Sequence, residues 1–167
     1  MIIMGIDPSL SSTGYAVLDG LGTKVKLVTS GNIKSSPKDG DIDIRINRIM
    51  AELVDIVTRT QTDYIVLERP AFGVNNGVRS TQDLAGLYYV ILCKLSRMGY
   101  LVIPVMPAGW KSKVGVKGKN RKEQKQSAVD LVERLFGKEV DTNDESDAIC
   151  IALYGSLLEV EKDGEKA

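Results

Sequence analysis

The sequence predicts an α/β fold in which one five-stranded mixed sheet carries helices on both faces. Three strand-like segments joined by turns open the chain, which is typical of an antiparallel meander. Helical patterns then alternate with short apolar runs, which is typical of strands joined by helical crossovers. No internal repeat interrupts the chain. We therefore expect one domain over residues 1–160, followed by a charged tail, 161–167, that frays.

The three meander strands are expected at residues 2–7, 14–19 and 24–32. The first is almost entirely apolar, as a strand buried on both faces should be. The third alternates apolar and polar residues, as a half-exposed strand does. A turn at 19–22 separates the second strand from the third, and a polar loop at 35–40 ends the meander.

The rest of the chain is assigned from its periodicity and its capping signals. Isoleucines and Leu53 recur at helical spacing from Ile42, and Gly137 is a plausible helix C-cap. Ser80 and Thr142 each begin a capping-box pattern. The expected order is βββαβαβαα, with helices at 42–60, 80–98, 121–136 and 142–160, strands at 64–68 and 100–105, and a loop at 109–120.

Composition excludes several classes of protein. The chain has no histidine, which rules out Ser-His-Asp and Cys-His catalysis and any zinc site with histidine ligands. No apolar stretch is long enough to cross a membrane, and the N-terminus lacks the basic region of a signal peptide. Cys93 and Cys150 lie in helical, apolar patterns and are expected to be buried free thiols. These features favour the reducing cytoplasm.

Four carboxylates lie where carboxylates are usually costly. Asp7 and Glu68 each end an apolar run, and Asp144 and Asp147 lie three residues apart at the start of a third apolar segment. A charge at the end of a buried element is expensive unless something pairs with it. Acids that converge without bases indicate a divalent cation.

Three of these acids also have ordinary explanations. Asp7 precedes Pro8 in a turn, where aspartate is common. Glu68 could pair with Arg69 or another base. Asp144 suits the first turn of a helix, where the helix dipole favours an acid.

Asp147 is harder to explain in this way. It lies one turn into the helix, on the stripe continued by Ile151, Tyr154 and Leu158, and so should face the sheet. Taken together, the four acids predict a site for Mg²⁺ or Mn²⁺, since hard oxygen ligands suit these ions. Two such ions about 4 Å apart can flank a phosphodiester.

A basic segment complements the acids. Residues 109–125 contain seven bases and one acid, whereas 139–147 contain five acids and no base. Lysines on a flexible loop neutralise phosphates and give salt-dependent affinity for nucleic acid. Trp110 either anchors this segment to the core or stacks on a base. The expected DNA-contacting bases are Lys111, Lys113, Lys117, Lys119, Arg121, Lys122 and Lys125.

At these residues the chain resembles the RuvC-type Holliday junction resolvases of the ribonuclease H-like superfamily. Residues 3–17, Ile-Met-Gly-Ile-Asp-Pro-Ser-Leu-Ser-Ser-Thr-Gly-Tyr-Ala-Val, are similar to the family's first strand and hairpin. Val-Leu-Glu at 66–68 is similar to its second acidic motif, and Asp-Glu-Ser-Asp-Ala-Ile at 144–149 to its closing one. The resemblance covers residues 1–158 and is closest to bacteriophage forms.

The resemblance implies a function and a set of roles. Asp7, Glu68, Asp144 and Asp147 would be the catalytic, metal-binding residues of a Mg²⁺-dependent endonuclease. A homodimer would cut opposing strands of a four-way DNA junction and leave 5′-phosphate ends. A two-fold dimer suits such a junction, since its two cuts are related by the same symmetry.

Three more residues receive roles from the same resemblance. Lys111 and one of Lys122 or Lys125 would contact phosphate. Phe72 would be a wedge between bases, or else a loop residue that covers the core.

Three alternatives remain from the sequence alone. The chain could be a ribonuclease H-like nuclease for other branched DNA or for RNA. Residues 5–15 would also fit the phosphate-gripping hairpin of one lobe of an actin-like or sugar-kinase ATPase. A non-catalytic DNA-binding relative is the third, and the complete acidic set argues against it.

Overall fold

The computed structural model describes residues 1–70, 78–140 and 142–164, with the backbone alone for 78, 79 and 159–164. Its single sheet has the order β3-β2-β1-β4-β5. β1, β2 and β3 are antiparallel, whereas β4 and β5 run parallel to β1. The strands are β1 (Ile2–Asp7), β2 (Ser12–Leu21), β3 (Lys24–Lys34), β4 (Tyr64–Glu68) and β5 (Leu101–Val105).

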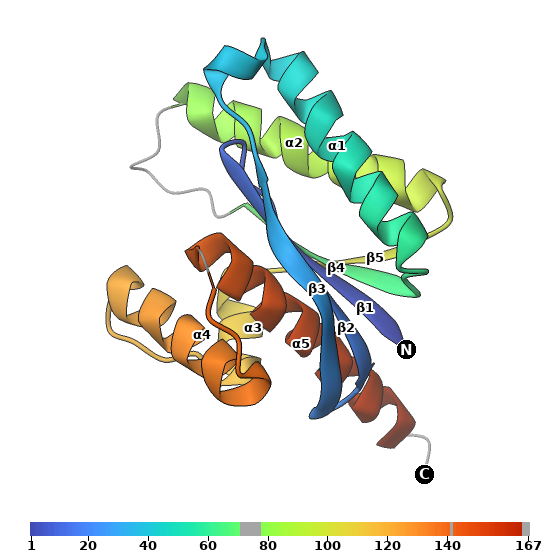
Figure 1. Ribbon diagram of the computed structural model, residues 1–167, viewed down its shortest axis with the longest axis vertical. Coiled ribbons are helices and arrows are strands. Elements are labelled where there is room, and N and C mark those ends of the chain that lie inside the picture. Colours follow the sequence, from blue (N-terminus) through green and yellow to red (C-terminus); the bar gives the residue numbers. More distant parts are fainter. Residues whose placement is uncertain (71–77, 141, 165–167) are drawn as a thin grey trace.

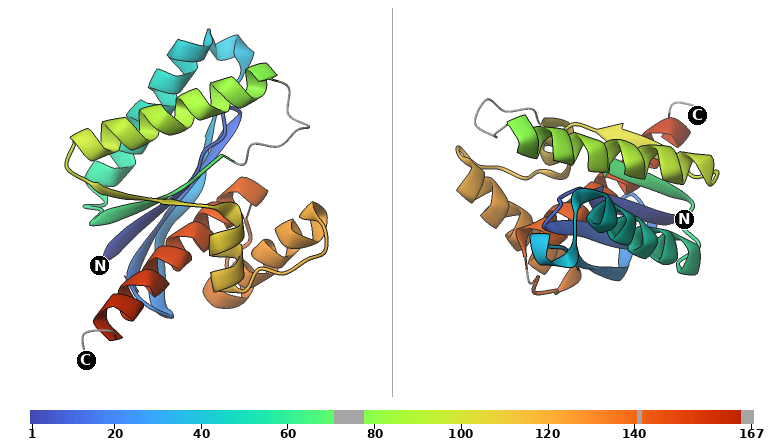
Figure 2. Two further views of the ribbon diagram at one scale, coloured as in Figure 1. Left: turned by 180° about the vertical axis from the view of Figure 1, so that it is seen from behind. Right: turned by 90° about the horizontal axis from the view of Figure 1, so that it is seen from above.

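Helices cover both faces of this sheet, as the sequence predicts (Figure 1). α1 and α2 pack on one face and α3, α4 and α5 on the other, which the two views of Figure 2 also show. Side chains alternate between the faces along a strand, so β1 gives Met4 and Ile6 to one core and Ile3 to the other. The helices are α1 (Ile42–Arg59), α2 (Val78–Arg97), α3 (Pro107–Val114), α4 (Arg121–Phe136) and α5 (Asn143–Gly164), with a 3₁₀ turn at Pro37–Asp39.

Three glycines let α5 lie directly on the sheet. A Cβ added to Gly5 would lie 2.3 Å from the carbonyl oxygen of Ala148, and one on Gly14 would lie 2.1 Å from that of Asp144. On the helix side, a Cβ on Gly155 would lie 2.7 Å from a methyl carbon of Val66. Such distances leave no room for a side chain. The glycines therefore fix the height of α5 above β1 and β2 and bring its first turn close to the end of β1.

The structure corrects the expected loop at 109–120. Pro107 and Gly115 delimit the additional helix α3, with proline in the first turn and glycine as a left-handed C-cap. Trp110 is the buried residue of this helix, so the sequence has no periodic apolar stripe from which the helix could be predicted. The order of elements is therefore βββαβαβααα, with one helix more than predicted.

Smaller corrections concern helix ends and a thiol. α2 already includes Val78 and Ser80, and α5 continues past the expected end at 160 to Gly164. Cys93 is exposed rather than buried, whereas Cys150 is buried as expected. Within the described ranges, no helix combines the length and the apolar character that a membrane crossing requires.

Candidate active site

Two of the four acids end neighbouring parallel strands. β1 and β4 pair in parallel with Ile6 opposite Leu67. Asp7 and Glu68 come next on their strands, so the two acids are neighbours at the carboxyl ends of β1 and β4. The ladder continues beyond Glu68, because the amide of Arg69 donates to the carbonyl oxygen of Val105 at 2.8 Å. The backbone of Glu68 is therefore held between two strands. Ligand sites in open α/β sheets lie at such carboxyl ends.

The first turn of α5 brings the other two acids to this edge. Asp7 pairs in register with Gly14, and Gly14 lies against the backbone of Asp144. Asp147 lies one turn further along α5, followed by the fully buried Ala148. The charges of the other three acids each raise the pKa of Asp7, so the four acids lie within electrostatic reach of one another.

Burial and mutual repulsion disfavour the charged forms of Asp7, Glu68 and Asp147. The pKa of Asp7 is raised well above its usual value, first by burial and then by Glu68, Asp147 and Asp144. Burial likewise raises the pKa of Glu68 to about 7, partly offset by the hydrogen bond from Trp110. It raises the pKa of Asp147 to about 6, although nearby lysines act in the opposite direction. The protein therefore places negative charge where charge is costly, which is a frequent property of functional sites.

The described residues give no direct base partner to these acids. Within them, the carboxylates of Asp7, Asp144 and Asp147 form neither a hydrogen bond nor an ion pair. The same residues contain no group of three acids or thiols arranged closely enough to form a ready metal cage. The donor set is nevertheless the one that a hard divalent cation prefers, and a cation would relieve the repulsion. The site thus fits such an ion by charge and donor type.

α3 contributes two side chains to the site. Trp110 is fully buried, and its indole Nε1 donates to Oε2 of Glu68. The ammonium of Lys111 lies 5.3 Å from the centre of the Trp110 ring and lowers the pKa of Asp7, Glu68 and Asp147. The base-stacking alternative for Trp110 is not supported, because its ring is inaccessible; it anchors α3 to the core.

α4 places further bases beside the acids. Asn120 caps this helix by accepting from the amide of Glu123 at 3.0 Å, which orients the first turn. Arg121 lowers the pKa of both Glu68 and Asp147, and Lys125 lowers that of Asp147. Of the two lysines that the sequence left open, Lys125 is the one whose charge reaches Asp147.

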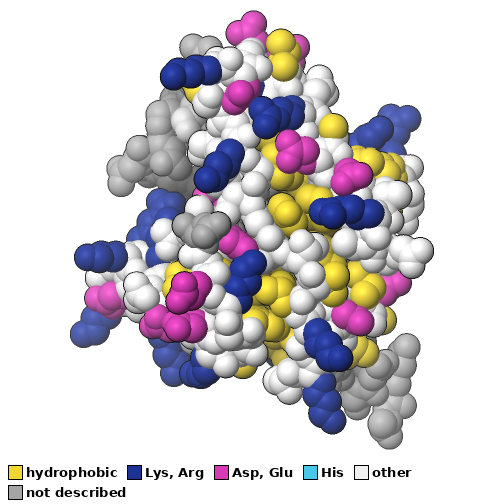
Figure 3. Space-filling view, viewed as in Figure 1, with side chains coloured by type: hydrophobic (Ala, Val, Ile, Leu, Met, Phe, Trp, Pro, Cys, Tyr) yellow, Lys and Arg dark blue, Asp and Glu magenta, His cyan; other side chains and the backbone are white. Residues whose placement is uncertain are grey.

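Two hollows flank the start of α4. One of about 510 Å³ is lined by Arg121, Lys122, Lys125, Gln126 and Asn143. The other, of about 500 Å³, lies between α3 and α4 and is lined by residues that include Lys111, Lys117 and Gln124. Figure 3 shows Lys and Arg side chains gathered at the edge over α4. Bases therefore line both hollows, and clustered bases of this kind neutralise phosphates.

The remaining sequence candidates are four exposed lysines and one residue outside the described ranges. Lys113, Lys117, Lys119 and Lys122 are exposed on α3, the α3–α4 connection and α4. Their part in DNA binding stays a prediction. Phe72 lies outside the described residues.

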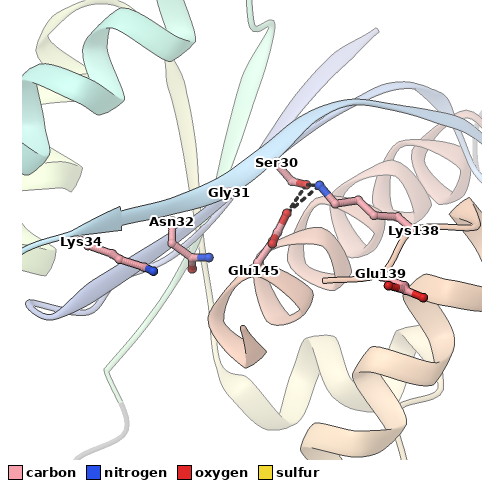
Figure 4. A pocket seen from close by; sticks show the side chains of 7 residues that line it. All are labelled: Ser30, Gly31, Asn32, Lys34, Lys138, Glu139 and Glu145. Carbon is pink, nitrogen blue, oxygen red and sulfur yellow. Dashed lines mark hydrogen bonds and ion pairs between the residues drawn. The ribbon is translucent and has the colours of Figure 1, made fainter. Parts of the chain in front are cut away.

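A third acid on the first turns of α5 behaves quite differently. Glu145 is buried, and its Oε1 accepts from the Ser30 hydroxyl at 2.7 Å and pairs with the Lys138 ammonium at 2.7 Å. Lys138 also donates to the Ser30 hydroxyl at 2.8 Å. Figure 4 shows this triad, which joins β3, the α4–α5 connection and α5 beside a hollow of about 260 Å³. This triad holds the start of α5 in place, and with it the positions of Asp144 and Asp147 relative to the sheet.

Sequence reasoning missed two of these contributions. For Trp110 the sequence indicates only an anchor or a stacking residue, although a buried tryptophan needs an acceptor for its N–H. For Glu145 it indicates a capping box with Thr142. The Thr142 hydroxyl does accept from the Glu145 amide at 3.2 Å, but the Glu145 side chain turns to Ser30 instead. Both contacts are long-range, and no local pattern contains them.

The ATPase alternative loses its main support at Gly14. In a phosphate-gripping hairpin, glycine allows the backbone to approach a phosphate. Here the space over Gly14 is filled by the backbone of Asp144 on α5. The glycine is needed for helix packing, so the hairpin signature requires no nucleotide.

Comparisons of the sequence with known proteins agree with this geometry. The profile of the family "Crossover junction endodeoxyribonuclease RuvC" matches residues 3–154. The protein of that name from Janthinobacterium sp. (strain Marseille) is 30% identical over 164 residues, covering 96% of this chain and 88% of the relative. The Agrobacterium fabrum protein is 31% identical over 153 residues, covering 90% and 86%.

Solved structures show the same fold. RuvC of T. thermophilus, solved in complex with a Holliday junction substrate, superposes with a TM-score of 0.80 at 19% identity, covering 96% of both chains. The fowlpox virus Holliday junction resolvase superposes with a TM-score of 0.58 at 18% identity, covering 97% of this chain and 99% of the other.

Proposed function

The chain belongs to the crossover junction endodeoxyribonuclease RuvC family, and from this premise we propose that it resolves four-way DNA junctions through the carboxylates of Asp7, Glu68, Asp144 and Asp147. Resolution is the hydrolysis of phosphodiester bonds in opposing strands, leaving 5′-phosphate ends. One observation carries the proposal: acids from β1, β4 and α5 converge without direct base partners beside a basic edge.

The cofactor that fits this donor set is Mg²⁺ or Mn²⁺, and we propose two ions per site. The four carboxylates would hold them, and such ions supply an activated water and a stabilised leaving oxygen. The carboxylates must be deprotonated to bind a cation. Lys111 and Lys125 support that form, since the charges of both lower the pKa of Asp147.

The basic residues bind and orient the DNA. The hollow lined by Arg121, Lys122 and Lys125 adjoins the acids and suits the phosphates next to the scissile one. Lys111 lies within electrostatic reach of Asp7, Glu68 and Asp147 and can stabilise negative charge that develops on the phosphate. Lys113, Lys117 and Lys119 extend this surface along the DNA. Such contacts give affinity that falls as salt increases.

The decisive experiment compares branched and linear DNA. A synthetic four-way junction, a fork and a linear duplex are each incubated with the protein in Mg²⁺, Mn²⁺ and Ca²⁺. We expect symmetric nicking of the junction in Mg²⁺ and Mn²⁺. Equal cutting of linear duplex would contradict junction selectivity, and preferred cutting of the fork would favour the alternative nuclease.

The site assignment is tested in the same assay with Asp7→Asn. This variant should bind the junction as the wild type does and fail to cut it. Asp19→Asn is the matched control, because Asp19 is an exposed acid of β2 that pairs with Ile2 at the opposite end of β1. Cutting by Asp7→Asn at the rate of Asp19→Asn would remove Asp7 from the site.

The homodimer is part of the same proposal. α2 presents an exposed face that contains Gly86, Tyr89, Val90 and Cys93. Tyr89 is 58% exposed, and the space over Gly86 is open. A two-fold junction calls for two copies of the site, and a second chain seated on this face would cover its apolar residues. Isologous pairing of α2 helices is therefore the arrangement that we propose.

Light scattering tests this arrangement. Tyr89→Glu should halve the molar mass and abolish paired cuts, because a charge would be buried at the two-fold axis. Val28→Glu is the control, since Val28 is 52% exposed on the edge strand β3. A dimer that survives Tyr89→Glu and dissociates with Val28→Glu would place the interface elsewhere.

A further inference from the structure

Trp110 connects α3 to the acid at the end of β4. Its side chain is completely buried in the core formed by α3, α4, α5 and the sheet. Its indole Nε1–H donates to Oε2 of Glu68. A large side chain packed on all sides has no other rotamer available, so the donor stays where the core places it. The carboxylate that accepts from it is held in the same way.

Neighbouring contacts hold the indole in turn. The Lys111 ammonium lies over its ring at 5.3 Å and donates to Oε1 of Gln124 on α4 at 3.3 Å. Gln124 then donates to the carbonyl oxygen of Gly118 at 3.3 Å. This chain of contacts links α3 and α4, which carry the basic edge, to the acid Glu68.

Space filling alone does not account for tryptophan at this position. A buried indole N–H without an acceptor costs free energy, whereas a phenylalanine or leucine fills similar space without that demand. Glu68 supplies the acceptor, and it does so with one of its two oxygens. Its other oxygen, Oε1, makes no hydrogen bond with the described residues.

We infer that Trp110 is a positioning residue for catalysis: its indole N–H holds Oε2 of Glu68 so that Oε1 stays oriented toward the divalent cation. This inference rests on the proposed function and adds to it a residue that carries no charge and binds no metal. Groups that orient ligating carboxylates change metal affinity by ~10–100-fold when they are removed. Trp110 should therefore affect the metal requirement more than DNA binding.

The test is Trp110→Phe, which keeps an aromatic ring and removes the N–H. The Mg²⁺ concentration that gives half-maximal junction cleavage should rise ~10-fold or more, as for other ligand-orienting groups. Junction affinity measured without metal should stay within ~2-fold, because the basic edge is unchanged.

Val132→Ala is the matched control for a loss of core packing. Val132 lies in the same core and is 1% exposed. It should lower the melting temperature and leave the Mg²⁺ requirement unchanged. If Trp110→Phe changes the Mg²⁺ requirement no more than Val132→Ala does, Trp110 only fills space and the inference fails.

A second readout needs neither cleavage nor a variant of Trp110. The chain contains one tryptophan, so its fluorescence reports on the Glu68 contact directly. Titrating Mn²⁺ into the wild-type protein should change the emission, and Glu68→Gln should abolish that change. Mn²⁺ binding, followed by calorimetry, with no change in emission would overturn the inference.

The two proposals can fail separately. A wild-type protein that cuts no junction overturns the proposed function, whereas the fluorescence titration still shows whether Trp110 and a cation at Glu68 are coupled. A wild-type protein that cuts junctions, with Trp110→Phe matching Val132→Ala, overturns the positioning role alone.

Discussion

Glu145 and Asp147 lie two residues apart on α5 and have opposite surroundings. Glu145 is buried and fully partnered by Lys138 and Ser30. Asp147 is half-buried, and among the described residues no hydrogen bond or ion pair reaches its carboxylate. Burial raises the pKa of Asp147 to about 6 even though Lys111 and Lys125 lie near. One acid thus satisfies its charge within the fold, and the other does not.

The difference separates structural from functional acids. A buried charge with hydrogen-bonded partners holds elements together and is costly to break. A charge held in place without a partner stores unfavourable energy that a bound cation can release. The triad around Glu145 fixes the start of α5. The helix then keeps the Asp147 carboxylate at a site where burial makes its charge unfavourable.

Replacing Asp147 should give the largest effect on activity. Asp147→Asn removes a ligand charge, so junction cleavage in saturating Mg²⁺ should fall by at least ~100-fold, as for other preorganised electrostatic groups. The same variant should be more stable than the wild type at pH 8 without metal, because a costly charge is gone. Single-turnover cleavage and urea unfolding measure the two effects. Loss of both activity and stability would make Asp147 a structural acid like Glu145.

Replacing Glu145 should give the opposite result. Glu145→Ala leaves Lys138 without its carboxylate partner, and breaking a buried pair costs about 3 kcal/mol of unfolding free energy. Cleavage per folded molecule should change much less than for Asp147→Asn. The control is Glu139→Ala, which removes an exposed acid from the rim of the same hollow. Equal unfolding curves for the two variants would show that the triad contributes nothing.

The metal-free protein should lose stability as pH rises. The pKa of Glu68 in the folded chain is raised to about 7 and that of Asp147 to about 6, both above their ordinary values. A carboxyl with a raised pKa favours the fold when protonated, so its contribution is complete below about pH 4 and lost by about pH 7. Urea unfolding in EDTA at pH 5 and pH 8 checks this. Asp147→Asn should flatten the fall, whereas a wild-type protein more stable at pH 8 would contradict the account.

The smallest effect is expected from changing Lys117 and Lys119. Among the bases, these two differ from Lys138 as Asp147 differs from Glu145. Lys138 is used within the fold, whereas Lys117 and Lys119 are exposed and available to DNA. Changing the latter two to glutamine should weaken junction binding and reduce the salt slope by about 1 for each phosphate that is no longer neutralised. Lys24→Gln with Lys26→Gln, two exposed lysines at the start of the edge strand β3, is the control. An unchanged slope would show that the α3–α4 connection does not touch phosphate.

Local pattern was sufficient for the strands that carry the site. β1 and β4 were predicted with the observed bounds, so Asp7 and Glu68 were correctly placed at strand ends. α4 was also predicted with its observed bounds, because a periodic stripe ends at a glycine cap. Asp147 was placed facing the sheet because its stripe continues into apolar residues.

Pattern failed where a single residue or a distant contact determines the structure. α3 has one buried side chain, Trp110, so its sequence shows no repeat of apolar residues at helical spacing. The bond from Trp110 to Glu68 joins residues 42 positions apart, and the contact between Ser30 and Glu145 joins residues 115 apart. Such contacts depend on how elements pack, which no window of sequence contains.

Mn²⁺ binding by calorimetry at pH 8 tests the central claim most directly, with wild type, Glu145→Gln and Asp147→Asn compared on the folded proteins. The account predicts binding by the wild type and by Glu145→Gln, and at least ~10-fold weaker binding by Asp147→Asn, because a ligand charge is lost. Equal binding by Asp147→Asn and the wild type would contradict it.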